Sequence, residues 1–151
     1  MSGELAALVS GLLGVEHSKS AAVHIYGITA LHVACSTGHY LKQARAIKAT
    51  AEAGGVQAVI KTMNMNQSSA VALNIVCVRM LKLYAQHTKE AQPRWGQWTQ
   101  EQATTAMECV INAMREFTVS LDLQCCAVSC LVAMCAQEGR SFLGKNERVC
   151  M

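Results

Sequence analysis

The chain repeats its apolar pattern with a spacing of about fifty residues, and this repeat restricts the folds it can adopt. One set of apolar positions recurs at 51 residues and a second set at 50, so one connection shortens by a residue per copy. The first set is Leu5, Val56 and Met107; Leu8, Val59 and Val110; Val9, Ile60 and Ile111; Leu12, Met63 and Met114. The second set is Gly27, Cys77 and Ala127; Ala30, Met80 and Cys130; Leu31, Leu81 and Leu131. A period of this length is typical of a solenoid, in which each unit buries its apolar face against its neighbours.

The apolar spacing inside each unit predicts helices. Steps of three and four residues, as from Leu5 to Leu8 and Val9, place side chains on one stripe of a helix. The pair Gly54 and Gly55 predicts a sharp break. The expected helices span 5–13, 21–35, 40–53, 56–63, 70–86, 99–115 and 121–137, with a stop at Gly139 and one further turn in the tail. β-Branched residues near 71–78 also fit a buried strand, but segments of this length without turn signals favour helix.

Thr99 and Gln102 form a capping-box pattern at the start of the sixth expected helix. In the helix expected over 40–53, three basic residues stand three apart, and three apolar residues stand three apart between them. We expect the first set on one side and the second on the other. The basic set is Lys42, Arg45 and Lys48, and the apolar set is Leu41, Ala44 and Ile47.

Composition indicates one helical domain in a reducing compartment. The chain has 151 residues, 52% of them hydrophobic and 15% charged, and a single proline. Its 8 cysteines accompany no convincing export signal, since Glu4 stands where a signal peptide needs a basic residue. The longest later apolar run, 125–136, is too short to span a bilayer, and no lipidation motif is present. We therefore expect a cytoplasmic protein, with the nucleus as an alternative, and no membrane association.

The net charge of +3 is unevenly distributed. The segment between Ser36 and Arg94 contains eight basic residues and only two acidic ones, whereas both flanks are slightly acidic. Such a segment attracts acidic peptides or phosphate, although a solvated surface explains it as well.

The residues of the second and third units resemble an armadillo repeat. The stretch 51–85 reads as a short helix that ends in Gly-Gly, then a second apolar helix, then a long third helix. The stretch 107–139 is similar, with Leu123 and Gln124 before the small residue Ala127, as in the third helix of that family. The first unit, 5–35, fits more loosely and lacks a first helix. HEAT repeats are the near alternative.

This resemblance implies an all-α, right-handed α-solenoid of about three armadillo-like repeats, the first and last of them incomplete. A single domain, 1–151, would comprise units at about 1–38, 39–90 and 91–139 and a partial cap at 140–151. The third helices of the family line a concave groove. Members that grip basic peptides carry Trp and Asn, four residues apart, at positions that here are Thr29 and Val33, Arg79 and Leu83, and Ser129 and Ala133. Because neither residue type is present, we expect a different ligand, and Arg79 with Lys82 suits an acidic or neutral one.

Two groups of residues suggest chemistry, but packing explains each of them better. The cysteines at 125, 126, 130 and 135 lack the CxxC pairs and histidines of typical zinc sites, so we expect them to act as small apolar side chains. Histidines 24 and 32 lie two turns apart without a partner at a catalytic spacing, and we expect ordinary polar or half-buried residues.

The segment PRWGQW at 93–98 brings Trp95 and Trp98 next to an arginine, residue types enriched in binding hot spots. Tryptophans in a long connection also anchor it to the body of a protein. Both readings remain open from the sequence.

The sequence therefore predicts a non-enzymatic scaffold that binds a protein or peptide, without metal, cofactor or nucleic acid, because no phosphate-binding loop, carboxylate pair or RNA-binding motif is present. The alternative is a self-associating solenoid that forms part of a larger assembly. The expected partner-binding residues are Thr29, Val33, Arg79, Lys82, Leu83, Ser129, Ala133, Trp95 and Trp98.

Overall fold

The computed structural model describes residues 2–14, 21–66, 70–87 and 99–149, with side chains between residues 3 and 136 of these ranges. The described residues form seven α-helices and no β-strand, which confirms the all-α prediction. The helices are α1 (Ser2–Leu13), α2 (Ala21–Ser36), α3 (Tyr40–Glu52), α4 (Gly55–Met65), α5 (Val71–His87), α6 (Gln100–Glu116) and α7 (Leu121–Val149).

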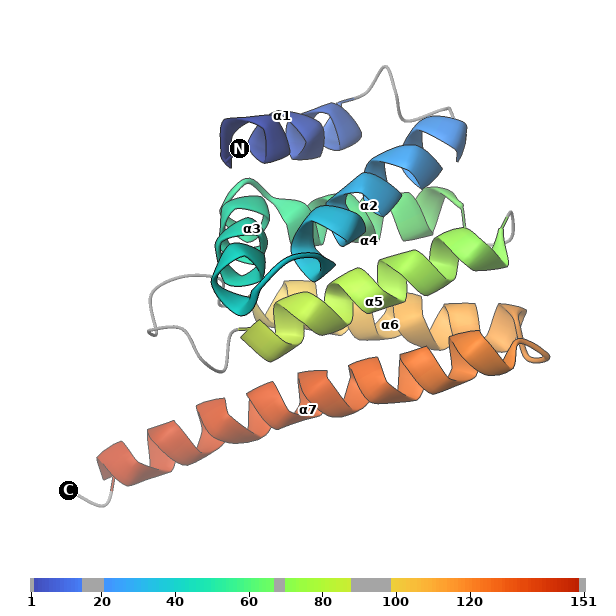
Figure 1. The fold of residues 1–151 in the computed structure, drawn as a ribbon. Helices are drawn as coiled ribbons and strands as arrows, with labels where there is room; N and C mark the ends of the chain where they lie inside the picture. The colour runs from blue at the N-terminus through green and yellow to red at the C-terminus, as the bar shows by residue number, and fades with distance from the viewer. Residues whose placement is uncertain (1, 15–20, 67–69, 88–98, 150–151) are drawn as a thin grey trace.

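Six of the helices form two layers. Helices α1, α4 and α6 pack side by side in one layer, which we call the back layer, and α2, α5 and α7 pack side by side in the other, which we call the front layer (Figure 1). The layers are joined in pairs, α1 with α2, α4 with α5, and α6 with α7. Helix α3 contacts α1, α2, α4 and α5 at one side of this stack. Three helix pairs thus follow one another in chain order.

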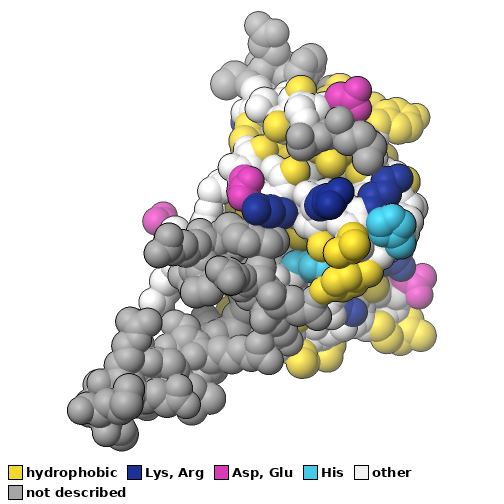
Figure 2. Space-filling view, turned by 60° about the vertical axis from the view of Figure 1, so that its left-hand side comes forward, with side chains coloured by type: hydrophobic (Ala, Val, Ile, Leu, Met, Phe, Trp, Pro, Cys, Tyr) yellow, Lys and Arg dark blue, Asp and Glu magenta, His cyan; other side chains and the backbone are white. Residues whose placement is uncertain are grey.

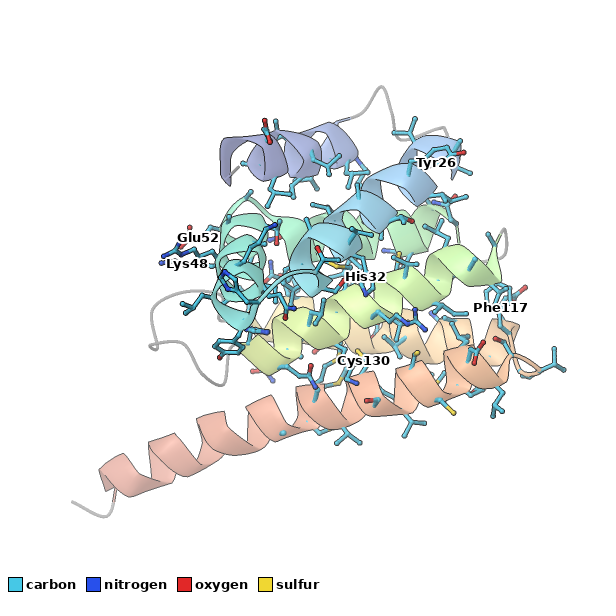
Figure 3. All side chains as sticks on the ribbon, viewed as in Figure 1. Tyr26, His32, Lys48, Glu52, Phe117 and Cys130 are labelled. Atoms are coloured by element: carbon cyan, nitrogen blue, oxygen red, sulfur yellow. The ribbon has the colours of Figure 1, made fainter. Side chains whose placement is uncertain are left out.

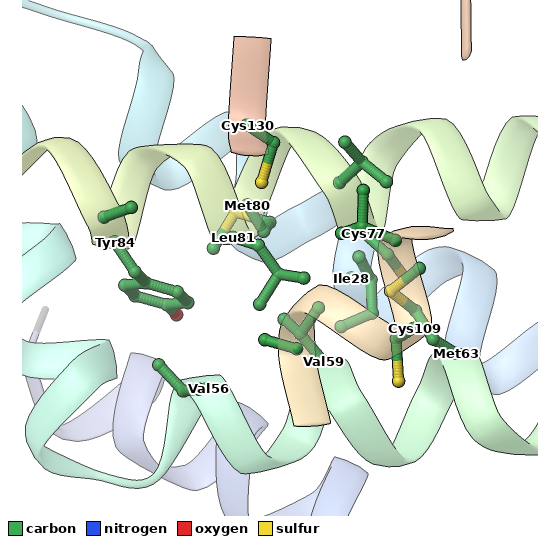
Figure 4. Packing of buried hydrophobic residues seen from close by; sticks show 14 of the residues in the cluster. Ile28, Val56, Val59, Met63, Cys77, Met80, Leu81, Tyr84, Cys109 and Cys130 are labelled. Atoms are coloured by element: carbon green, nitrogen blue, oxygen red, sulfur yellow. The ribbon is translucent and has the colours of Figure 1, made fainter. Parts of the chain in front are cut away.

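One hydrophobic core runs between the layers and joins all three pairs. Buried side chains from five helices meet in its centre (Figure 4). They include Ile28 from α2, Val59 from α4, Leu81 from α5, Cys109 from α6 and Cys130 from α7. Because both layers contribute to this core, each helix of the front layer packs against the back layer and is fixed by that contact.

The Gly-Gly joint between α3 and α4 is required by a buried tyrosine. Gly54 has a φ of 97°, in the left-handed region that glycine adopts without strain. A Cβ at Gly55 would collide with the Tyr84 hydroxyl and lie 2.8 Å from the carbonyl oxygen of Thr50. The Tyr84 hydroxyl donates a hydrogen bond of 3.0 Å to Thr50 Oγ1. The predicted break at this joint is confirmed, and its cause is the close approach of α5.

The second set of repeat positions is fully buried in α5, whereas some of its equivalents in α2 and α7 are exposed or half-buried. The buried positions common to α2, α5 and α7 are Gly27, Cys77 and Ala127. Leu31 and Leu81 are also fully buried, whereas Leu131 is half-buried. Met80 and Cys130 are buried, but Ala30 is exposed. The differences lie in α2 and α7, the helices at the two ends of the front layer.

Helix α7 does not stop at Gly139 but continues to Val149, so the predicted stop is wrong. The expected separate cap at 140–151 is instead continuous with α7 as far as Val149. A glycine inside a helix costs only about 1 kcal/mol relative to alanine and removes no hydrogen-bond donor. A single glycine is therefore a weak terminator.

The expected apolar side of α3 is also corrected. Ile47 is buried, but Leu41 is 61% exposed. Each step of three residues turns about 60° backwards around a helix, so two steps separate Leu41 from Ile47 by about 120°. Residues spaced by three therefore drift off one face. The same drift leaves Lys42, Arg45 and Lys48 on a wide exposed arc.

Candidate interaction surface

The front layer presents one face that every unit leaves accessible to solvent. Three positions, seven residues apart along each helix, are exposed or half-buried in α2, α5 and α7 alike. Seven residues make about two helical turns, so these positions form one line along each helix. They are Ala22, Thr29 and Ser36 in α2; Ala72, Arg79 and Gln86 in α5; and Asp122, Ser129 and Ala136 in α7. We call this set the open face.

Arg79 gives the centre of the open face a positive charge. It is exposed on α5, the middle helix of the layer. His32 lies nearby on α2 (Figure 3), and burial together with the charge of Arg79 lowers the pKa of this histidine. The remaining members are small or neutral except Asp122 at the start of α7. The centre therefore suits a carboxylate or a neutral polar group.

The structure brings only some of the predicted partner-binding residues together on this face. Thr29, Arg79 and Ser129 occupy equivalent positions on it, and the first two are exposed. Val33 is 49% exposed, but Ala133, its equivalent two units later, is only 5% exposed. Ala133 is thus buried, which corrects its placement on an accessible groove.

A four-residue step explains this difference. It turns a side chain about 40° around the helix, from the open face towards the preceding helix of the layer. Leu83 is half-buried because α2 precedes α5, and Ala133 is buried because α5 precedes α7. Val33 stays exposed because no third-helix equivalent precedes α2 in the described chain.

Lys82 lies at the contact between α5 and α7. It is half-buried, and its charge acts on the thiol of Cys130. Burial raises the pKa of Cys130 to about 12, and the nearby lysine opposes that rise. Figure 3 shows Cys130 between α5 and α7. Trp95 and Trp98 lie outside the described residues, as does the whole segment 93–98.

A polar position inside each front-layer helix was missed by the sequence interpretation. Gln124 Nε2 donates to the carbonyl oxygens of Met114, at 2.9 Å, and Phe117, at 3.1 Å. These bonds hold the end of α6 against α7. Asn74, fifty residues earlier, donates from Nδ2 to the carbonyl oxygens of Ala70, at 2.9 Å, and Asn66, at 3.4 Å.

His24 occupies the same position in α2. Its Nδ1 accepts a hydrogen bond of 3.1 Å from Asn66 Nδ2, so α2 is tied to the end of α4. Its Nε2 is buried with no hydrogen-bond partner among the described residues. Burial, and then the charge of Lys61, lower the pKa of His24. The signal for this set was a polar residue at a fifty-residue interval in otherwise apolar helices.

Lys61 adds a further bond between units of the back layer. Its Nζ donates to the carbonyl oxygen of Leu13 at 2.7 Å. Leu13 is the last residue of α1, and a cation at the C-terminal end of a helix is favourable because the helix dipole is negative there. The hydrogen bond connects α4 to α1.

A second charged region lies on α3. Figure 2 shows a row of Lys and Arg side chains across this side of the molecule, with hydrophobic side chains next to it. Lys42, Arg45 and Lys48 are exposed on α3. Lys48 lies 4.0 Å from Glu52 (Figure 3), an exposed pair that contributes little to stability. This region agrees with the interpretation of the basic segment as a solvated surface.

The cysteines of α7 differ in burial. Cys130 is fully buried, as expected of a packing residue, whereas Cys125 and Cys135 are exposed, so the packing prediction is wrong for these two. In the described part of the chain no group of three or more potential ligands is close enough to hold a metal ion. None of the helices there combines the length and apolar composition that crossing a bilayer requires.

Comparison with known proteins finds no match of the chain to a family model, to a curated protein or to a solved structure.

Proposed function

We propose that this chain is an armadillo-like α-solenoid that binds a protein or peptide along its open face, without enzymatic activity. The observation that carries the proposal is the recurrence of three accessible positions in each of α2, α5 and α7. A repeated row of equivalent positions on parallel helices suits an elongated ligand, which contacts one unit after another.

Local features support the armadillo-like assignment over other helical repeats. Helices α3, α4 and α5 follow the order of two shorter helices and one longer helix, with the Gly-Gly joint between the first two. The polar side chains at 24, 74 and 124 recur near the start of each long helix and bind the end of a back-layer helix. A cytoplasmic or nuclear location fits the cysteines of the described ranges, which are free thiols.

The chemistry of the open face favours an acidic or neutral partner. Arg79 stands at its centre, and its guanidinium can hold a carboxylate through two parallel hydrogen bonds. Thr29 and Ser129, at the equivalent positions on either side, offer hydroxyl groups. Because Trp and Asn are absent here, stacking on lysine stems is not available to a basic peptide.

A matched pair of charge reversals tests the proposal. Affinity capture with the wild-type chain identifies partners, and titration then compares Arg79→Glu on the open face with Arg45→Glu on α3. Both arginines are exposed, so both variants should keep the fold. We expect Arg79→Glu to weaken binding by about tenfold or more, as expected for a hot-spot arginine, and Arg45→Glu to leave binding unchanged. Equal affinity of the two variants for every partner would contradict the placement on the open face.

A further inference from the structure

The middle helix of the front layer shows which faces a unit uses to pack on its neighbours. On α5, one row of side chains faces α7, and we call it and its equivalents fifty residues away the forward face. A second row faces α2, and we call it and its equivalents the rear face. Helical spacing groups Val71, Ile75, Val78, Lys82 and Ala85 on one side of α5, and the charge of Lys82 acts on Cys130 of α7, so this side is the forward face. The rear face lies on the other side, towards α2, and comprises Leu73, Val76, Met80 and Leu83.

The forward face is more buried where a following helix packs against it, although Val71 at the start of α5 is still 36% exposed. Ile28 and Cys35 in α2, which α5 follows, are fully buried, and so are Val78 and Ala85 in α5, which α7 follows. The equivalents in α7 are exposed. They are Leu121 (75% exposed), Cys125, Val128 (52%), Val132 (64%) and Cys135. This forward face of α7 contains no charged residue.

The rear face shows the converse. Leu73 and Met80 in α5 are buried, and so are Leu123 and Cys130 in α7. The equivalents in α2 are Val23 (37% exposed), Tyr26 (76%), Ala30 and Val33 (49%). Tyr26 lies on the side of α2 away from α5 and α7 (Figure 3). This rear face is likewise apolar throughout.

A groove lies next to the rear face of α2. It has a volume of about 500 Å³ and is lined by α1 and α2. Its walls are formed by the small or apolar residues Ala7, Leu8, Gly11, Leu12, Ala22, Val23, Tyr26 and Gly27. Gly11 leaves space in this wall, since nothing lies within 4 Å of where its Cβ would be. The groove can therefore accept side chains from a helix that packs on α2.

We propose that a second copy of this chain docks here, with the forward face of its α7 against the rear face of α2. The same two faces already pack on each other twice within the chain, at the contacts of α2 with α5 and of α5 with α7. The influence of Lys82 on Cys130 marks this pairing, because one is on the forward face of α5 and the other on the rear face of α7. A contact of this kind joins two different surfaces, so each copy offers one of each and association continues end to end.

Two substitutions, each of which introduces a negative charge, test this arrangement by sedimentation velocity. Reducing conditions exclude disulfides between copies through Cys125 and Cys135. The sedimentation coefficient of the wild-type protein should rise with its concentration, because more copies associate. Val128→Glu and Tyr26→Glu should each be monomeric, because each removes one of the two faces. Val119→Glu is the control, since Val119 is 97% exposed in the connection between α6 and α7, and it should associate like the wild type.

The decisive step is to mix the two monomeric variants. Each retains one intact face, so the mixture should form a 1:1 dimer and nothing larger. This rescue also shows that both variants are folded. A wild-type chain that stays monomeric up to its solubility limit, a mixture that stays monomeric, or a Tyr26→Glu variant that still associates would overturn the proposal. Arg79→Glu should associate normally, so this test is independent of partner binding on the open face.

Discussion

Helices α5 and α7 carry the same pattern of side chains but have different numbers of neighbours. Val78 in α5 and Val128 in α7 are the same residue at equivalent positions, yet the first is fully buried and the second is 52% exposed. Helix α5 lies between α2 and α7, whereas α7 has a front-layer neighbour on one side only in the described chain. The repeat therefore gives each front-layer helix two faces that can pack on a neighbouring helix. Whether the side chains of such a face are exposed depends on whether the helix has a neighbour on that side.

The largest expected effect comes from placing a charge at these two valines. Val78→Glu buries an unpaired carboxylate and should destabilise the fold by about 4 kcal/mol or more. Val128→Glu leaves its carboxylate in solvent and should change stability by less than about 0.5 kcal/mol when both chains are compared at a dilution at which the wild type is monomeric. Urea unfolding followed by circular dichroism measures both. Similar losses in the two variants would remove the distinction between the middle and the end.

Substitutions at two glycines test whether α5 packs closely against the joint between α3 and α4. Gly55→Ala pushes a methyl group against Tyr84 and the Thr50 carbonyl, and overpacking of this kind costs about 1–3 kcal/mol. Gly11→Ala in α1 meets no neighbouring atom and should stabilise that helix by up to about 1 kcal/mol. Thermal unfolding of the two variants should therefore shift in opposite directions. A stabilised Gly55→Ala variant would contradict the packing of Tyr84 against the joint.

The bonds between the layers should contribute smaller amounts. Gln124→Ala removes two hydrogen bonds to the end of α6, and Asn74→Ala removes one to Asn66 at the end of α4 and one to Ala70 directly before α5, so each should cost about 1 kcal/mol or somewhat more. Gln86→Ala, on the exposed side of α5, is the matched control and should be nearly neutral. Denaturant midpoints measure all three. Equal midpoints for Gln124→Ala and Gln86→Ala would show that the bonds between layers do not stabilise the fold.

The smallest expected effect is a dependence of stability on pH at the first unit. Burial lowers the folded-state pKa of His24 below its ordinary value of 6.5, so the unfolded chain binds more protons as the solution becomes acidic. The contribution of His24 to the free energy of unfolding should be fully present above about pH 6.5 and should fall as the pH drops below it. His24→Gln should lessen this fall in melting temperature, with the remainder due to His32 and His87, whose pKa values burial also lowers. An unchanged fall in His24→Gln would contradict the assignment.

Local signals in the sequence predicted the helices well. The capping box at α6 is confirmed, because Thr99 Oγ1 accepts from the Gln102 backbone and Gln102 Oε1 accepts from the Thr99 backbone. Such a signal depends only on residues within one turn. The Gly54–Gly55 joint was found for the same reason, since glycine pairs mark a break wherever they stand.

The accessible surface was predicted less well, because exposure depends on which helix lies alongside. Val33 and Ala133 share a register position, and only the order of helices in the front layer exposes one and buries the other. Leu41 was misplaced because a three-residue spacing drifts around the helix. The set at 24, 74 and 124 was visible in the register, but its role required the backbone carbonyls that these side chains reach.

Native-state hydrogen exchange on the Val128→Glu variant, which should be monomeric, tests the central claim most directly. Amides with neighbours on both sides exchange only through larger openings of the structure. We predict the slowest exchange in α5 between Leu73 and Ala85, and faster exchange in α2 and in α7 between Leu123 and Met134. Exchange in α7 as slow as in α5 would contradict the account of a middle unit covered on both sides and two uncovered ends.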